Sequence, residues 1–175
     1  MVGSLLISLL RHSDRVTSAC QAQLVNSIGS IRTEPGGPAW RQSMFHPFAQ
    51  MAAAAKGTVL QAEIRSPRHE TARYGEVPVI DAAATFDEAS GDLAVFAVNR
   101  HPSEEVTFDV ELRAFPGRRL EMASVLHDPD WRASNTREDP DRVTPHPHPK
   151  AEVTGDRLHC VLPPVSWNVF RVARS

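Results

Sequence analysis

Residues 16–48 decide how this chain is interpreted, and they read VTSACQAQLVNSIGSI, RTEPGGPAWRQ and SMFHPF in three consecutive parts. Residues 16–26 are mostly small or apolar and do not alternate strictly between apolar and polar. This pattern is typical of a strand that is covered on both faces, as in a parallel sheet. We therefore expect a buried strand over residues 16–26, followed by a turn-rich loop and the start of a helix.

Three amides interrupt the strand pattern, at Gln21, Gln23 and Asn26. Burying an amide is costly unless its donors and acceptors are all paired. Amides near the carboxyl end of a parallel strand indicate a ligand site, because that edge carries the chemistry in barrel enzymes. The alternative is that these amides hydrogen-bond to the backbone of neighbouring strands, and the pattern leaves both readings open.

The loop at residues 33–38, TEPGGP, contains two prolines and two glycines. Glycine permits positive φ and proline fixes φ, so this composition prescribes a defined turn. Trp40 and Arg41 follow the loop. The indole could stack on a sugar face, or the two side chains could form a structural cation–π pair. Glu34 is the only carboxylate within residues 16–48, and its sequence context gives no sign of a perturbed acid.

Helical patterns flank this stretch on both sides. Residues 2–11 place four leucines on one side of a helix. Residues 44–56 also predict a helix, in which Pro47 is tolerated in the first turn and Gly57 ends the element. We place a domain boundary at Gly57.

Beyond Gly57 the hydrophobic period changes to that of strands. The clearest case is residues 106–113, where apolar and polar side chains alternate, as an antiparallel sandwich with one wet face requires. Residues 127–150 are rich in Pro, Asp, Arg and His and predict a long surface loop. The expected fold class is therefore mainly β, with a β-sandwich over residues 58–175. The strand-like segments read TVLQAEI, VPVIDAAATF, DLAVFAVNR, VTFDVELRAF, LEMASVL, AEVTG, LHCVL and WNVFRV.

Composition excludes several classes of function. A formal net charge of −2 gives no general attraction to nucleic acid or to an anionic membrane. No window is long enough to span a bilayer, and the opening MVGSLLISLL lacks the basic start and cleavage site of a signal peptide. Cys20 and Cys160 show no metal or redox spacing. We expect both to be buried thiols in a reducing compartment, the cytoplasm.

Neither a metal nor a cofactor is expected. His146 and His148 would point to one side of an extended chain, but zinc needs three or four ligands with supporting partners. The acidic segments 128–130 and 138–141 lack the glycine and the ordered ligand positions of a calcium loop. The sequence also contains no G-x-S-x-G nucleophile elbow and no phosphate-binding glycine loop.

Several segments together carry a resemblance to a known family. In order they read SLLRHSDRV, ACQAQLVN, TEPGGPAWRQ, FHPFA, VPVIDAAAT, LAVFAVNR and LPPVSWNVFR. This series resembles the C-terminal part of the α-L-arabinofuranosidases of glycoside hydrolase family 51. The resemblance implies that residues 1–57 are the C-terminal remnant of a (β/α)8 catalytic barrel, with residues 16–26 as its last strand. It further implies that residues 58–175 form a jelly-roll-like β-sandwich packed on that barrel.

The family resemblance also implies a function. Its members are retaining glycoside hydrolases that release terminal α-L-arabinofuranosyl residues from polysaccharides and oligosaccharides. Their acid/base and nucleophile glutamates lie on the fourth and seventh barrel strands, which the resemblance places before Met1. We therefore expect the chain alone to be inactive and assign it no catalytic residue. Gln23 matches a family glutamine that hydrogen-bonds the arabinofuranosyl unit, and Asn26 and Trp40 are weaker candidates beside it.

Two departures from the family pattern concern the same loop. Residues 27–30 read SIGS where the family more often reads VIAPI, and His46 stands where an aromatic residue is usual. The expected partners are an arabinofuranosyl-containing oligosaccharide or polysaccharide, a missing barrel portion, and further copies in a homo-oligomer. The alternative hypothesis is a non-catalytic sandwich, either a carbohydrate-binding module that uses Trp131 or a structural and assembly domain.

Overall fold

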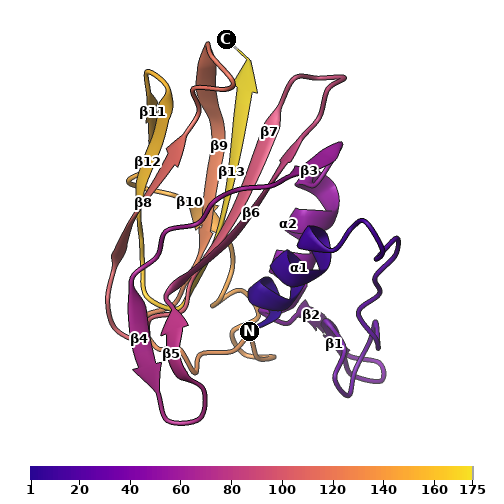
Figure 1. Ribbon diagram of the computed structural model, residues 1–175. Coiled ribbons are helices and arrows are strands. Elements are labelled where there is room, and N and C mark those ends of the chain that lie inside the picture. Colours follow the sequence, from indigo (N-terminus) through magenta and orange to yellow (C-terminus); the bar gives the residue numbers. More distant parts are fainter. Residues whose placement is uncertain (175) are drawn as a thin grey trace.

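The computed structural model describes residues 1–174, and it arranges them in three layers (Figure 1). Two helices, α1 (Val2–Arg11) and α2 (Phe45–Ala54), cover one face of a six-stranded sheet, and a three-stranded sheet covers the other face. Both helices agree with the sequence prediction. Neither helix in the described part of the chain has the length and apolar character needed to cross a bilayer.

All strand pairs within the sheets are antiparallel, as the sequence predicts for a sandwich. The six-stranded sheet has the order β10-β9-β13-β7-β6-β3, and the three-stranded sheet has the order β11-β12-β8. Two further hairpins pair β1 with β2 and β4 with β5. The strand bounds are β1 (Ile31–Thr33), β2 (Ala39–Arg41), β3 (Thr58–Leu60), β4 (Arg68–Thr71), β5 (Gly75–Pro78), β6 (Ile80–Phe86), β7 (Leu93–Asn99), β8 (Val106–Glu111), β9 (Arg118–Leu126), β10 (His146–Pro147), β11 (Glu152–Thr154), β12 (Arg157–Leu162) and β13 (Ser166–Arg174).

The six-stranded sheet carries a hydrophobic core on each face. Every residue of β7 is buried, because its alternate side chains enter different cores. Val95 and its neighbours face the three-stranded sheet, whereas Phe96 and its neighbours face the helices. Two covered faces explain why LAVFAV is continuously apolar. By contrast, β8 lies in the outer sheet and alternates between partly buried and exposed residues, as predicted.

The predicted strand over residues 16–26 is wrong for the described chain. This segment is irregular, and its pairing is limited to an isolated parallel bridge between Val25 and Ile31. A parallel strand needs hydrogen-bonding neighbours along its edges, and residues 1–174 supply that single bridge. As a result Leu24 is 67% exposed. The prediction that Cys20 is buried is also wrong, since it is exposed, whereas Cys160 is buried as predicted.

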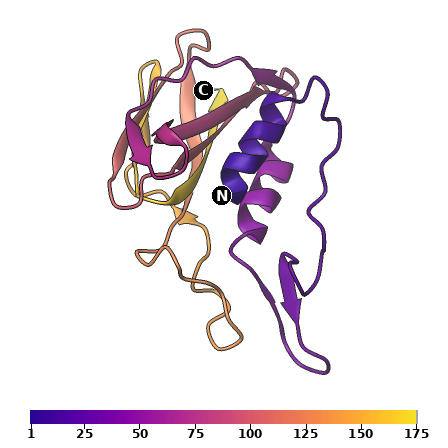
Figure 2. The same ribbon diagram turned by 60° about the horizontal axis from the view of Figure 1, so that its bottom comes forward.

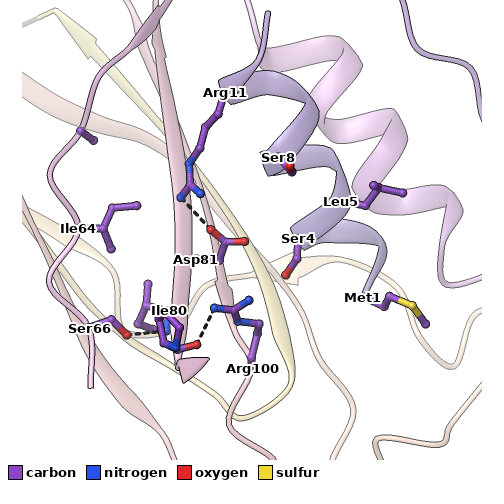
Figure 3. A pocket seen from close by; sticks show the side chains of 12 residues that line it. Met1, Ser4, Leu5, Ser8, Arg11, Ile64, Ser66, Ile80, Asp81 and Arg100 are labelled. Atoms are coloured by element: carbon purple, nitrogen blue, oxygen red, sulfur yellow. Dashed lines mark hydrogen bonds and ion pairs between the residues drawn. The ribbon is translucent and has the colours of Figure 1, made fainter. Parts of the chain in front are cut away.

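Polar contacts tie the helices to the six-stranded sheet. Figure 3 shows Arg11 at the end of α1 reaching Asp81 of β6, with 2.7 Å between Nη2 and Oδ1. Gln50 of α2 accepts a hydrogen bond from Trp167 Nε1 at 2.9 Å and donates one to Ser124 Oγ at 3.0 Å. These contacts join the helical layer to β6, β9 and β13, so the helices are an integral layer of the described fold.

The chain leaves the helical layer at a glycine that the geometry requires. Gly57 follows α2 with φ at +73°, and a Cβ there would lie 2.1 Å from the carbonyl oxygen of Phe86. Only glycine tolerates both the positive φ and this close approach. The first strand of the six-stranded sheet, β3, begins at the next residue.

Candidate functional site

The candidate site is built on the hairpin of β1 and β2, which follows the irregular segment. Val25 bridges Ile31, and the backbone N–H of Asn26 donates to the carbonyl of Ile31 at 2.7 Å. Trp40 stands opposite Arg32 across the hairpin. Asn26 and Trp40 therefore belong to one small structure, and Gln23 precedes it by two residues. The loop TEPGGP forms the hairpin turn, as its composition predicts, but the flanking strands were not anticipated.

Asn26 has a structural task in this hairpin. Its Nδ2 donates to Thr33 Oγ1 at 2.9 Å, and its Oδ1 accepts from the backbone N–H of Thr33 at 2.7 Å. Its backbone has φ at +59°, a conformation that asparagine tolerates better than most residues. For this amide the geometry matches the alternative reading, in which the side chain satisfies nearby backbone and side-chain groups.

The two glutamines of the segment differ from Asn26. Gln23 is exposed, so its amide is open to a ligand from solvent. Gln21 is partly buried, and its Oε1 lies out of solvent without a hydrogen-bond partner among residues 1–174. A buried acceptor without a donor costs about 1–3 kcal/mol. Both glutamines therefore have capacity for a hydrogen bond from a group outside the described chain.

Trp40 is also partly buried with an unsatisfied polar atom. Its indole Nε1–H has no acceptor within residues 1–174. The cation–π pair that the sequence allowed does not form, because the guanidinium of Arg41 lies over Phe45, at 5.2 Å from the ring centroid. An unpaired indole donor and an exposed amide are both groups that pair with the hydroxyl groups of a polar ligand.

Glu34, the carboxylate of the hairpin turn, is engaged in an ion pair. Its Oε2 lies 2.8 Å from Nη1 of Arg137. Close by, the buried Asn135 donates to the carbonyl of Arg41 at 2.8 Å and also pairs with the backbone of Val143. The sequence did not predict either contact. Asn135 and Arg41 are 94 residues apart, and the composition of a surface loop does not indicate which distant residues the loop contacts.

The His146-Pro147-His148 motif places its two histidines in different environments. His146 is exposed, whereas His148 is buried and lies 5.7 Å from the ring of Phe170. Burial lowers the pKa of His148, and Lys150 lowers it further. Within residues 1–174, no group of three or more His, Cys, Asp or Glu side chains is placed to hold a metal ion.

The family model for the α-L-arabinofuranosidase C-terminal domain matches residues 1–166 of this sequence. The chain belongs to that family. It is 46% identical over 171 residues to an intracellular exo-α-(1→5)-L-arabinofuranosidase of Streptomyces lividans, covering 98% of this chain and 26% of the relative. It is 45% identical over 175 residues to an exo-α-(1→6)-L-arabinofuranosidase of Bifidobacterium longum, covering 97% of this chain and 33% of the relative.

The fold of this chain also matches a solved structure from the same family. A family 51 α-L-arabinofuranosidase from Bifidobacterium longum superposes with a TM-score of 0.92 at 41% identity, covering 97% of this chain and 33% of that one. The family resemblance read from the sequence is therefore confirmed. The chain spans about a quarter to a third of the length of these relatives, and it matches their C-terminal part.

Proposed function

We propose that this chain is the C-terminal region of a retaining α-L-arabinofuranosidase. Residues 1–57 complete the last part of a (β/α)8 barrel, and residues 58–175 form the sandwich that braces it. The observation that carries the proposal is the family match over nearly the whole chain, together with a TM-score of 0.92 to a family 51 enzyme. The partners are an arabinofuranosyl-containing saccharide and the remaining barrel; a homo-oligomer stays a prediction.

In this proposal the hairpin site binds the sugar and does not cleave it. Retaining hydrolysis requires two carboxyl groups about 5–5.5 Å apart across the scissile bond. The hairpin offers Glu34, whose carboxylate is already paired with Arg137. The two catalytic glutamates are then supplied by barrel strands that this chain does not contain.

Each candidate residue receives a separate role. The exposed amide of Gln23 hydrogen-bonds a hydroxyl of the arabinofuranosyl unit. Trp40 supplies the unpaired indole N–H and an apolar ring face. Asn26 fixes the hairpin through Thr33, so that it positions the other two. When barrel strands pair with residues 16–26, this segment becomes the last strand and its apolar side chains are covered.

The similarity of this chain to its relatives does not single out one linkage. The relatives named for (1→5) and (1→6) linkages are almost equally similar to this chain, at 46% and 45% identity. The relatives named intracellular support a cytoplasmic location for the assembled enzyme.

A chimaera tests this function. The barrel portion of the Streptomyces lividans relative would be joined to this chain in place of its own C-terminal region. The chimaera is expected to release nitrophenol from 4-nitrophenyl α-L-arabinofuranoside, whereas this chain alone is not. Gln23→Ala in the chimaera should lower kcat/KM by about 10- to 100-fold, the value of one lost substrate hydrogen bond.

A matched control is Gln61→Ala, which removes an exposed glutamine between β3 and β4. This change should leave kcat/KM within twofold of the parent chimaera. Turnover by the isolated chain would refute the assignment of both carboxylates to the rest of the barrel. A folded but inactive chimaera would refute the proposed role of the chain in the enzyme.

A further inference from the structure

A cleft of about 490 Å³ lies where the first residues of α1 and α2 meet the loop that follows β9. Its lining mixes an indole ring, carboxylates, an imidazole and apolar side chains. That mixture of aromatic surface with a few polar groups is typical of small-ligand sites. The loop contributes His127, Asp128, Asp130 and Trp131 to this lining.

Trp131 is an exposed but oriented ring. It is 62% exposed, whereas the tryptophan in the sheet, Trp167, is 4% exposed. The guanidinium of Arg132 lies 4.6 Å from the Trp131 ring centroid. A cation over one face holds the ring and leaves the other face for a ligand. The apolar C–H face of a sugar ring fits such a surface, since a large aromatic ring gains most from a flat partner.

The acceptors beside Trp131 are fixed by the loop itself. Asp128 accepts hydrogen bonds from the backbone N–H of Asp130 at 2.8 Å and from Nε of Arg142 at 3.2 Å. Asp130 accepts from the backbone N–H of Arg132 at 3.0 Å. The hydrogen bond from Arg142 is the main reason that the pKa of Asp128 is lowered, so this carboxylate is ionised at neutral pH. Acceptors held in place before binding cost little to order.

The charge and the unsatisfied groups select the kind of ligand. Arg142 pairs with Asp128 at 3.2 Å and with Asp130 at 3.8 Å, so the two carboxylates do not make the cleft strongly anionic, and within residues 1–174 they do not belong to a group able to hold a metal ion. His127 Nδ1 is buried without a hydrogen-bond partner in the described chain. Hydroxyl groups both donate to carboxylates and pair with an imidazole nitrogen. A neutral ligand with several hydroxyl groups suits this paired lining, and the exposed Asp130 can accept a hydrogen bond from one of them.

The loop that lines the cleft also contacts the candidate sugar site. Asn135 of the same loop bonds the carbonyl of Arg41 at 2.8 Å, and Arg137 pairs with Glu34 at 2.8 Å. Figure 2 shows this loop, in orange, and the hairpin of β1 and β2 extending from the same end of the molecule. One loop therefore lines the Trp131 cleft and also holds the hairpin.

We propose that the Trp131 cleft is a second carbohydrate-binding site, which holds a further residue of a neutral arabinose-containing oligosaccharide. The ligand class rests on the proposed function, whereas the cleft itself rests on its own geometry. The site is distinct from the hairpin that holds Gln23 and Trp40. It adds affinity for chains longer than one sugar and takes no part in bond cleavage.

The three tryptophans of the chain allow the two sites to be observed separately. The full chain would be labelled with 5-fluorotryptophan and titrated with α-(1→5)-linked arabinotetraose, while fluorine NMR follows each residue. Trp131 reports on the cleft, Trp40 on the hairpin, and the buried Trp167 serves as an internal reference. Signals are assigned from single Trp→Phe variants.

The expected result is a saturable shift of the Trp131 signal with arabinotetraose and a smaller one with L-arabinose. If Trp131 is unmoved while Trp40 shifts, the second site is refuted and the proposed function stands. If Trp131 shifts and Trp40 does not, the second site stands without any contribution from the hairpin, which then requires the barrel to bind sugar. If neither moves, the second site is refuted, whereas the hairpin assignment, which requires the barrel, is decided by the Gln23→Ala chimaera. A shift that follows protein concentration without sugar would assign the cleft to a second copy and refute the sugar site.

A matched pair of variants closes the test. Trp131→Ala should weaken arabinotetraose binding by about tenfold or more, which corresponds to 1.4 kcal/mol. Tyr74 is the control, because it is 70% exposed and carries Arg73 at 5.3 Å from its ring, yet it lies in the turn between β4 and β5. Tyr74→Ala should leave the affinity unchanged. Equal losses in the two variants would mean that any exposed aromatic suffices, and would refute a specific cleft.

Discussion

Strand β7 and the segment around Leu24 were both predicted to be strands, but they have opposite surroundings. In β7, LAVFAV is buried at every position, and Phe96 and Ala97 are fully inaccessible. In the other segment Leu24 is 67% exposed, and Ile28 is 70% exposed. The difference lies in neighbours, because β7 is hydrogen-bonded to both β6 and β13 and covered on both faces.

This contrast shows that an apolar segment forms a strand only where neighbouring strands pair with its edges and other layers cover its faces. In the proposed enzyme the barrel supplies them for residues 16–26. The described chain supplies them for β7 from its own sequence. Strand β7 thus finds all its neighbours within the chain, whereas residues 16–26 require the rest of the barrel.

The largest expected difference is in thiol reactivity. Burial raises the pKa of Cys160 from 9.0 to about 12, with a contribution from Asp109, whereas Cys20 is exposed in the irregular segment. A rise of this size makes the Cys160 thiolate about 1000-fold scarcer at neutral pH. Iodoacetamide should therefore label Cys20 alone in the native chain and both cysteines in denaturant, as mass spectrometry of the intact protein would show.

Iodoacetamide labelling of the chimaera tests whether the barrel covers Cys20. If the barrel completes the strand, labelling of Cys20 should slow markedly, while that of Cys160 stays slow. Cys20→Ser removes the fast reaction and serves as the control. Rapid native labelling of Cys160 would mean that the core between the two sheets opens, and would contradict the contrast drawn here.

The second effect is on the free energy of unfolding. Phe96 is fully buried in β7 and stacks on Trp167, with 5.8 Å between ring centroids. Phe96→Ala should destabilise the chain by about 3–5 kcal/mol, through lost burial and the cavity that remains. Leu24→Ala, the matched change in the exposed segment, should stay within about 0.5 kcal/mol. Urea unfolding followed by tryptophan fluorescence measures both, and comparable losses would contradict the comparison.

Much of the fold follows from local sequence patterns. The two helices and the alternation in β8 could be predicted, because the spacing of apolar residues along each element shows which of its faces is buried. The failures share one cause. Residues 16–26 and Cys20 were predicted buried from composition alone, but burial depends on partners that composition does not reveal.

The candidate site was predictable only in part. Gln23, Asn26 and Trp40 were found from their residue types and from the family resemblance. Sequence alone could not show that the amide of Asn26 is committed to Thr33, nor that a loop distant in sequence reaches Arg41 through Asn135. Contacts over such separations depend on the whole fold, so they lie beyond local patterns.

A third, smaller effect concerns how firmly the helices join the sheet. A Cβ at Gly3 of α1 would lie 2.6 Å from Cε3 of Trp167, a ring held in the core. Alanine gains about 1 kcal/mol of helix propensity over glycine, whereas overpacking costs about 1–3 kcal/mol. Because the ring cannot yield easily, Gly3→Ala should be destabilising by about 1 kcal/mol net.

The control for that change lies in the same helix. Ser8→Ala alters an exposed position of α1 and should stay within about 0.5 kcal/mol of the parent protein. Urea unfolding again measures both variants. A stabilised Gly3→Ala chain would mean that α1 is not seated against Trp167, and would place the helices outside the cooperative unit of the sheets.

The smallest expected effect is the pH dependence of the free energy of unfolding. It depends on two buried histidines, one in the helical layer and one beside the six-stranded sheet. His46 lies in α2, and His148 lies after β10. Burial is the main cause that lowers the pKa of each histidine below 6.5. At His46 the charge of Arg41 lowers the pKa further, and Asp141 opposes this shift. At His148 the charge of Lys150 lowers the pKa further. The unfolded chain then binds more protons than the native chain at pH values below 6.5. The free energy of unfolding should therefore be level above that pH and fall as the pH decreases toward the lowered native values.

Substituting either histidine separates the two contributions to this slope. His46→Gln and His148→Gln should each make the stability less dependent on pH, as measured by urea unfolding at about pH 8 and about pH 5.5. If only His148→Gln flattens the profile, α2 has already separated from the sheet before the cooperative transition. If both do, the helical layer unfolds together with the sandwich, as the contacts of Gln50 with Trp167 and Ser124 require. A wild-type profile without any slope in this range would contradict the burial of both imidazoles.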